Sequence, residues 1–322
     1  MEEVNHVHEE HKPHEHHGHH HDHDHVKVLS SLSNIFIICI VLNVIYVFIE
    51  ASVGFFENSL GLLSDAGHNL GDVFSLLLAL IAFHLAKISN NKRFTYGYKK
   101  STILISLLNA IILLVAVGAI VVESINKLRN PEPIDGSVIS WTAGAGIIVN
   151  GLTTLLLMKS QKHDLNVRGA FLHMAADTLV SVGVVISGLV IMYTGFYLID
   201  PIISLVIAGI ILISTIHLLM ESLRLSLDGV PETIRIEEVK EVLEAQPHVL
   251  NVHHLHIWAI STTDVALTAH VVIDDLSGME DVKDALKTVL REKGINHSTL
   301  EMESTGTHCH ESSLIINSNE GK

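Results

Sequence analysis

The sequence SLGLLSDAGHNLGDVFSLLLALIAFHLA, residues 59–86, combines two properties that are seldom found together. A helix that crosses a lipid bilayer needs about 20 mainly apolar residues, and this stretch is long and apolar enough to do so. It nevertheless contains a histidine and an aspartate, His68 and Asp72, near its middle. Because a charge at the bilayer centre costs about 2.5–3.5 kcal/mol, residues of this kind indicate a functional site.

Five more stretches have the same length and apolar character. The six predicted spans are residues 33–55, 60–86, 102–125, 137–159, 169–194 and 201–222. We therefore expect an α-helical membrane bundle of six transmembrane helices. The predicted domains are a disordered His-rich leader (1–29), the membrane domain (30–222), a polar C-terminal domain (223–305) and a flexible tail (306–322).

Composition limits the classes of function. A net charge of −15 argues against nucleic-acid binding, which needs a basic surface. The two cysteines, Cys39 and Cys309, lie in different parts of the chain and predict no disulfide framework. The first apolar run follows an acidic leader instead of a short basic segment, so no cleavable signal peptide is predicted.

The basic residues predict the orientation of the spans. Lys and Arg are enriched in cytoplasmic loops of membrane proteins. The links 87–100 and 159–168 are basic, whereas the links between spans one and two and between spans five and six have no Lys or Arg. Lys127 and Arg129, between spans three and four, are a mild exception. We expect a multi-pass protein of the cell membrane with both termini in the cytoplasm.

Two predicted spans carry the same polar pair. His68 and Asp72 lie in span two, and His173 and Asp177 lie in span five. Residues four apart share one face of a helix, so each span offers an imidazole and a carboxylate to the same neighbour. Apart from Lys159 at the last position of span four, the six apolar runs contain no Lys or Arg to balance the aspartates. Two His nitrogens and two Asp oxygens form a four-coordinate set suited to zinc.

The position of the pairs also suggests a transport mechanism. Each pair lies in the middle span of a three-span half, and the two middle spans run in opposite directions. Inverted halves that meet at a midplane site are typical of secondary transporters. A single intramembrane His or Asp is often a packing or helix–helix hydrogen-bonding residue, but the repeated spacing disfavours that interpretation. The pattern alone is also compatible with a proton channel.

The C-terminal domain predicts the element order α-β-β-α-β, which is a small α+β domain. The first helix is expected to begin near Pro231, and the last to end at Gly294. Residues 249–261 and 264–275 alternate apolar and polar side chains, which predicts a hairpin with Thr262 near its turn.

Potential metal ligands gather on these strands. His253 and His270 are expected to be cross-strand neighbours, and a second metal site is plausible. Alternatively, His254 and His256 are ordinary residues of an exposed face.

The N-terminal leader has a separate composition. Residues 1–25 hold eleven histidines interleaved with Glu and Asp. Such a segment cannot form a core, and dense imidazoles beside carboxylates bind zinc, copper or nickel loosely. We interpret it as a metal buffer near the pore. An expression tag is the alternative, although the irregular spacing and the acidic residues disfavour it.

Several motifs resemble the cation diffusion facilitator family, which includes bacterial cobalt–zinc–cadmium resistance efflux proteins and zinc transporters. The resemblance covers about residues 30–305. The motifs that carry it are NSLGLLSDAGHNLGD (58–72), RFTYGY (93–98), NVRGAFLHMAAD (166–177), DP (200–201), VHHLHIW (252–258) and TAHVVID (268–274).

The resemblance implies a homodimer of six-span protomers with a cytoplasmic ferredoxin-like domain, which exchanges metal for protons. The family's transport ligands fall on His68, Asp72, His173 and Asp177. Its cytoplasmic metal site falls on His253, His270 and Glu303. Cys309 or His310 is a possible additional ligand. Some members bind metal in the loop after span two, but residues 87–100 have neither His nor Asp, so no loop site is predicted.

The predicted function is secondary active export of Zn²⁺, and also of Cd²⁺ and Co²⁺, from the cytoplasm in exchange for protons. Zinc is then both the transported substrate and a regulatory ligand. A membrane-anchored sensor of divalent metals, with the leader and tail as working parts, is the alternative. An intramembrane zinc hydrolase is disfavoured, because four protein ligands fill the coordination position that a catalytic zinc keeps open.

Overall fold

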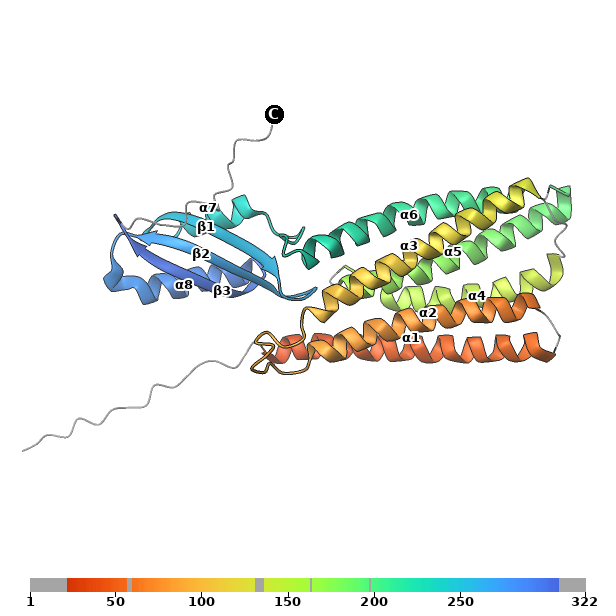
Figure 1. Ribbon diagram of the computed structural model, residues 1–322, viewed down its shortest axis with the longest axis horizontal. Coiled ribbons are helices and arrows are strands. Elements are labelled where there is room, and N and C mark those ends of the chain that lie inside the picture. Colours follow the sequence, from red (N-terminus) through yellow and green to blue (C-terminus); the bar gives the residue numbers. More distant parts are fainter. Residues whose placement is uncertain (1–21, 57–59, 131–135, 163, 197, 307–322) are drawn as a thin grey trace, which may run out of the picture.

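The computed structural model describes residues 22–56, 60–130, 136–162, 164–196 and 198–306. A bundle of long helices forms one end of the molecule, and a small domain with a β-sheet forms the other (Figure 1). The chain passes from the bundle to the sheet domain at the end of α6.

Six long helices form the bundle, as the sequence predicts. They are α1 (Asp22–Phe56), α2 (Leu60–Ala86), α3 (Ser101–Arg129), α4 (Gly136–Leu157), α5 (Leu165–Thr194) and α6 (Ile199–Ser226). Five of them contain a segment long and apolar enough to cross a membrane, and α4 contributes the shorter apolar segment Gly144–Leu157 within the described residues. Their outward-facing Leu, Ile, Val and Phe side chains are exposed, as expected for a surface in contact with lipid.

The first helix begins earlier than predicted. It starts at Asp22, so the expectation that residues 1–29 lack structure is wrong for residues 22–29. Extending an existing helix avoids the cost of nucleation. Residues 1–21, which hold most of the leader's histidines, lie outside the described residues.

Two of the main helix pairs lie within the halves of the bundle, and a third joins the two halves. Helix α1 lies along α2, α4 lies along α5, and α3 lies along α6. Helices α2 and α5 also contact each other. At this contact, a buried cluster includes Leu76, Ala79 and Phe83 of α2 and Ala170 and Met174 of α5. The small alanine side chains let the two backbones approach closely.

The second domain has the predicted order of elements. They are α7 (Ile236–Glu244), β1 (Val249–Ala259), β2 (Val265–Ile273), the short 3₁₀ helix η1 (Leu276–Gly278), α8 (Met279–Glu292) and β3 (Ile295–Ser304). The sheet order is β1-β2-β3, with β1 antiparallel and β3 parallel to β2. This is the ferredoxin-like arrangement without its first strand. Helices α7 and α8 contact each other and share one buried core with the sheet.

One predicted boundary in this domain is wrong, and another is confirmed. Helix α7 starts at Ile236 and not near Pro231. The Ile234 N–H donates to the Pro231 carbonyl in a turn, and Arg235 is extended, so the helix begins only after these residues. At the other end, α8 stops at Glu292, and Gly294 has a left-handed φ of 82°, which glycine adopts without strain.

Candidate metal sites

The first candidate site lies between α2 and α5, inside the bundle. Asp72 and His173 are almost completely buried, with 1% and 6% of their surfaces exposed. The Nε2 atom of His173 lies 2.6 Å from Oδ1 of Asp72 and 3.9 Å from Oδ2 of Asp177. One ligand atom from each of the three residues lies within 4.8 Å of the others. The packing of α2 on α5 thus brings three of the four predicted transport ligands together.

His68, the fourth predicted ligand, lies in α2 one turn before Asp72. Its side chain is outside the described part of the structure, so its participation stays a prediction. Helical spacing puts it on the same face of α2 as Asp72.

A buried carboxyl group of α1 also contacts α2, and it is not among the predicted site residues. Glu50 of α1 is 4% exposed and lies within a membrane span. Its Oε2 accepts a hydrogen bond of 2.8 Å from the Asn69 amide, and its Oε1 accepts one of 3.2 Å from the Tyr46 hydroxyl. Asn69 directly follows His68 in α2, so this network connects α1 to the helix that carries two predicted ligands. Tyr46 and Glu50 lie four residues apart in an apolar run, and hence on one face of a helix. This pattern is the signal from which the sequence could have indicated the network.

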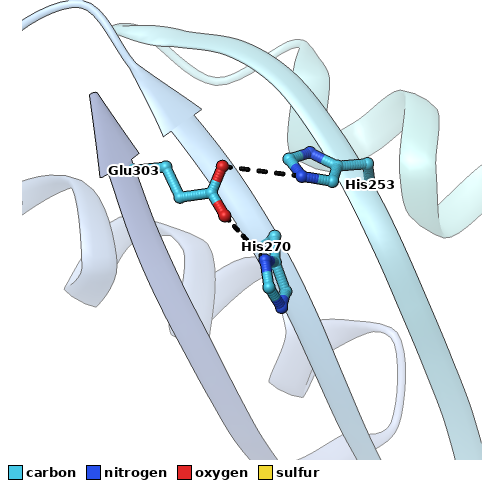
Figure 2. A group of neighbouring side chains, drawn as sticks. All are labelled: His253, His270 and Glu303. Carbon is cyan, nitrogen blue, oxygen red and sulfur yellow. Dashed lines mark hydrogen bonds and ion pairs between the residues drawn. The ribbon is translucent and has the colours of Figure 1, made fainter. Parts of the chain in front are cut away.

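The second candidate site lies on the sheet, where β1, β2 and β3 each contribute one residue (Figure 2). His253 pairs with His270 across the antiparallel ladder, as predicted. Glu303 points between them: Oε1 lies 2.6 Å from Nδ1 of His270, and Oε2 lies 3.5 Å from Nε2 of His253. Their ligand atoms also lie within 4.8 Å of one another. Two imidazoles and a carboxylate are ligands that zinc accepts.

A third histidine approaches this cluster because of an irregularity in β1. The pairing of β1 with β2 shifts between His253 and His256, and His254 has a φ of 48°. Such a bulge re-aims a side chain. The His254 ring lies 5.1 Å from the His270 ring, centroid to centroid. His254 is thus half-buried beside the cluster, whereas His256 is exposed, as the alternative interpretation expects. Cys309 and His310 lie outside the described residues.

A third group of potential ligands, at the end of α6, is better described as an ion-pair cluster. His217, Glu221 and Glu232 have ligand atoms within 4.8 Å of one another. However, Arg168 lies 2.9 Å from Glu221, and Arg224 lies 3.2 Å from Glu232. The two guanidinium groups already balance both carboxylates, and a cation would have to compete with them.

The turn between β1 and β2 docks on the bundle. The Thr262 hydroxyl donates to Asp164 (2.5 Å), and the Thr262 N–H donates to the hydroxyl of Thr102 at the start of α3 (3.1 Å). Asp164 caps α5, where it accepts hydrogen bonds from the backbone N–H groups of Asn166 and Val167. Burial raises the pKa of Asp164, although these hydrogen bonds oppose the shift.

A cavity of about 660 Å³ opens beside Thr262 and Asp164, between the two domains. The hydrogen bond between Thr262 and Asp164 joins the strands that carry His253 and His270 directly to α5, the helix that carries His173.

Comparison with known proteins agrees with this architecture. Residues 36–225 match the cation efflux transmembrane domain, and residues 231–305 match the cytoplasmic domain of cation efflux proteins. The chain therefore belongs to the cation efflux family, also called cation diffusion facilitators, which is a family of membrane transporters. Its members combine a helical membrane domain with a small cytoplasmic domain of this kind.

Several curated relatives cover most of the chain. A cadmium, cobalt and zinc/H⁺–K⁺ antiporter of Bacillus subtilis is 36% identical over 275 residues, or 84% of this chain and 88% of the relative. The zinc transporter ZitB of Escherichia coli is 36% identical over 271 residues (82% and 86%). The metal cation efflux system protein CzcD of Cupriavidus metallidurans is 35% identical over 268 residues (83% and 85%). This chain is accordingly a membrane protein that exports metal cations.

Proposed function

We propose that this protein exports Zn²⁺ from the cytoplasm in exchange for protons, and that it also accepts Cd²⁺ and Co²⁺. The observation that carries the proposal is the approach of Asp72, His173 and Asp177 inside the membrane domain. The buried Asp72 and the partly buried Asp177 need positive charge nearby, and the apolar runs contain no Lys or Arg apart from Lys159 at the end of span four. A divalent cation bound by nitrogen and oxygen ligands meets this need, and His68 completes a tetrahedral set.

Proton exchange follows from the chemistry of the ligands. A His nitrogen or a carboxylate must lose its proton to bind a metal ion, so metal and protons compete for the same atoms. The 2.6 Å contact between His173 and Asp72 positions one proton between them when metal is absent. Zinc that arrives from the cytoplasm displaces protons, and protons from the other side displace zinc.

The pairing of the helices supports alternating access. The α1–α2 and α4–α5 pairs occupy equivalent places in the two halves, and α2 meets α5 at the candidate site. A rocking movement of one half against the other would expose this contact to each side in turn. In this proposal both chain termini lie in the cytoplasm, and the leader buffers metal near the entrance.

Zinc also acts as a regulatory ligand in the proposed mechanism. The group of His253, His270 and Glu303 binds it in the cytoplasm, and the Thr262–Asp164 contact transmits the change in the sheet to α5. The match to a cytoplasmic domain family described as a dimerisation domain supports a homodimer, whose arrangement metal binding would bias. A sensor without transport activity would use the same cytoplasmic site, and metal flux distinguishes the two functions.

The test is metal flux in proteoliposomes that contain only the purified protein. Zinc, cadmium, cobalt and manganese are supplied separately, with and without a proton gradient. We expect zinc uptake that an acidic lumen accelerates and that alkalinises the lumen, because protons leave as zinc enters. Tight zinc binding without flux would support the sensor and overturn the proposal. Zinc flux without coupled proton movement would overturn the exchange mechanism alone.

A further inference from the structure

The loop between α2 and α3, residues 87–100, lies at the cytoplasmic end of the bundle. It contacts the sheet domain: Lys99 forms an ion pair of 3.1 Å with Asp264, and the Tyr96 hydroxyl lies 3.3 Å from Nε2 of His297. The loop therefore lies where the helical bundle meets the sheet domain (Figure 1). Because it directly follows a membrane-spanning helix, we expect it near the lipid headgroups.

The loop is ordered by its own hydrogen bonds. The Asn91 side chain accepts from the backbone N–H groups of Arg93 (2.9 Å) and Phe94 (3.0 Å). Gly97 has a φ of 67°, and a Cβ there would lie 2.9 Å from the Ile88 carbonyl oxygen, so the turn requires glycine. A loop held in this way presents its side chains in a defined arrangement, which lowers the entropic cost of binding a ligand.

The charge of the loop is only partly balanced. It has five basic residues and no acidic one. Lys99 pairs with Asp264, and Lys100 pairs with Asp228 at the end of α6. Lys92 and Arg93, in contrast, form no ion pair with any residue of the described part of the chain. Both are exposed next to the membrane, where anionic lipids attract basic residues.

Arg93 lines a cavity of about 390 Å³ between the loop, Asp228 after α6 and the end of β1. The cavity combines cationic and aromatic side chains with one carboxylate, that of Asp228, which pairs with Lys100. The other side chains that matter here are Arg93, Phe94, Tyr96 and Trp258. Phe94 and Tyr96 are about half exposed. Aromatic rings of this kind concentrate at membrane–water interfaces, and a guanidinium group binds a phosphate through two parallel hydrogen bonds.

Exposed apolar side chains continue from the cavity onto the bundle. Leu104 lies one turn after Lys100 on α3 and is 56% exposed. Leu227, next to Asp228, is 74% exposed. A ligand whose charged head occupies the cavity and whose hydrocarbon part runs along the bundle would satisfy both surfaces.

We propose that this cavity, the α2–α3 headgroup pocket, binds the phosphate of an anionic phospholipid from the cytoplasmic leaflet. Arg93 binds the phosphate, Lys92 adds long-range attraction, and Phe94, Tyr96 and Trp258 surround the glycerol region. The lipid bridges the loop and the end of β1, and so it stabilises the junction between the two domains. This site is separate from both candidate metal sites and does not depend on the transported ion.

The test measures lipid retention by the full-length protein with native mass spectrometry. The purified protein is equilibrated with phosphatidylglycerol or with zwitterionic phosphatidylcholine. We expect preferential retention of phosphatidylglycerol, reduced about fivefold in Arg93→Gln, since one basic residue near the membrane contributes about 1 kcal/mol. Arg93→Lys keeps the positive charge but loses the planar guanidinium group. Its retention of phosphatidylglycerol should therefore lie between that of the wild type and that of Arg93→Gln. Arg129→Gln, at the opposite end of α3, is the matched control and should behave like the wild type.

Three outcomes would overturn the proposal. The first is equal retention of phosphatidylglycerol by the wild type and Arg93→Gln. The second is displacement of the lipid by inorganic phosphate at low concentration, which would identify a site for soluble anions. The third is a loss of the dimer in Arg93→Gln with unchanged lipid retention, which would show that a second copy of the chain covers the pocket. Circular dichroism of each variant establishes that the comparison is between folded proteins.

Discussion

The two candidate metal sites are built from the same chemical groups but in opposite surroundings. In the bundle, Asp72 and His173 are almost completely buried between two apolar helices. In the sheet domain, Glu303 is buried, but the side chains of His253 and His270 are 27% and 16% exposed. Water can therefore reach part of the sheet site, whereas Asp72 and His173 are shielded from it, so that an uncompensated charge there would be costly.

This difference assigns different roles to the two sites. A site that must hold either metal or protons couples the two ions, which is what an exchanger requires. A partly solvated site can be empty at little cost, so its occupancy follows the free concentration of metal. The first arrangement suits transport and the second suits sensing. The contact between Thr262 and Asp164 joins the two regions.

The largest expected effect comes from removing a bundle ligand. Asp72→Asn preserves the size of the side chain but removes its charge and one ligand oxygen. Because loss of a group that merely orients a ligand reduces metal affinity by about 10–100-fold, loss of the ligand itself should reduce zinc flux by more than about 100-fold. Flux in proteoliposomes measures this. Ser75→Ala, three residues further along α2 and also buried, is the control. Wild-type exchange by Asp72→Asn would refute the assignment of the transport site.

A smaller effect is expected from the sheet site. Glu303→Gln removes the carboxylate that lies between His253 and His270. In a protein whose bundle site is already inactivated, zinc binding to the sheet should weaken by about 10–100-fold. With the bundle site intact, basal flux should persist while activation by cytoplasmic zinc is lost. Glu301→Gln is the matched control, because Glu301 is exposed and lies only at the edge of the group. Unchanged activation in Glu303→Gln would separate this cluster from regulation.

A still smaller effect is expected from a mutation at the contact that connects the two metal sites. Thr262→Val removes the hydroxyl that donates to Asp164 but leaves both metal clusters intact. We expect unchanged zinc binding to the sheet and unchanged basal flux, with activation by zinc reduced by about threefold to tenfold, as for a coupling free energy near 1 kcal/mol. Thr262→Ser keeps the hydroxyl and should restore activation. If Thr262→Val and Thr262→Ser are activated equally, the signal does not pass through this hydrogen bond.

The smallest effect concerns the pH dependence of stability. Burial raises the pKa of Asp164 in the folded protein above its unfolded value. The protonated form is thus favoured on folding, and the corresponding stability is fully present below the unfolded pKa and lost as the pH rises through the folded one. Asp164→Asn still accepts hydrogen bonds as a helix cap but cannot ionise.

Thermal unfolding of Asp164→Asn should therefore depend less on pH than that of the wild type, in the range above the ordinary pKa of aspartate. Thermal denaturation in detergent at a series of pH values measures this. An equally steep dependence in both proteins would mean that another group is responsible. Asp275→Asn is a suitable comparison, because hydrogen bonds from Ser277 lower the pKa of that exposed carboxyl group instead of raising it.

Local patterns were sufficient to predict much of the molecule. The apolar length of the spans predicted the bundle, because a bilayer admits only structures that satisfy their own backbone hydrogen bonds. Alternation of apolar and polar residues predicted the β1–β2 hairpin, including the pairing of His253 with His270. In contrast, the start of α1 at Asp22 depends on extension of a helix that the membrane segment nucleates, and the composition of the leader did not indicate it.

By itself, the sequence determined which residues are candidates for the transport site. The spacing of four residues, its occurrence in two spans, and the cost of an aspartate in the membrane are all local properties. Only the tertiary structure decided which residues meet: Asp72 with His173 across two helices, Glu303 with two histidines, and Glu50 with Asn69. The bulge that turns His254 toward His270 also emerged only there. These contacts depend on the packing of segments far apart in the chain, and periodicity within one segment carries no information about them.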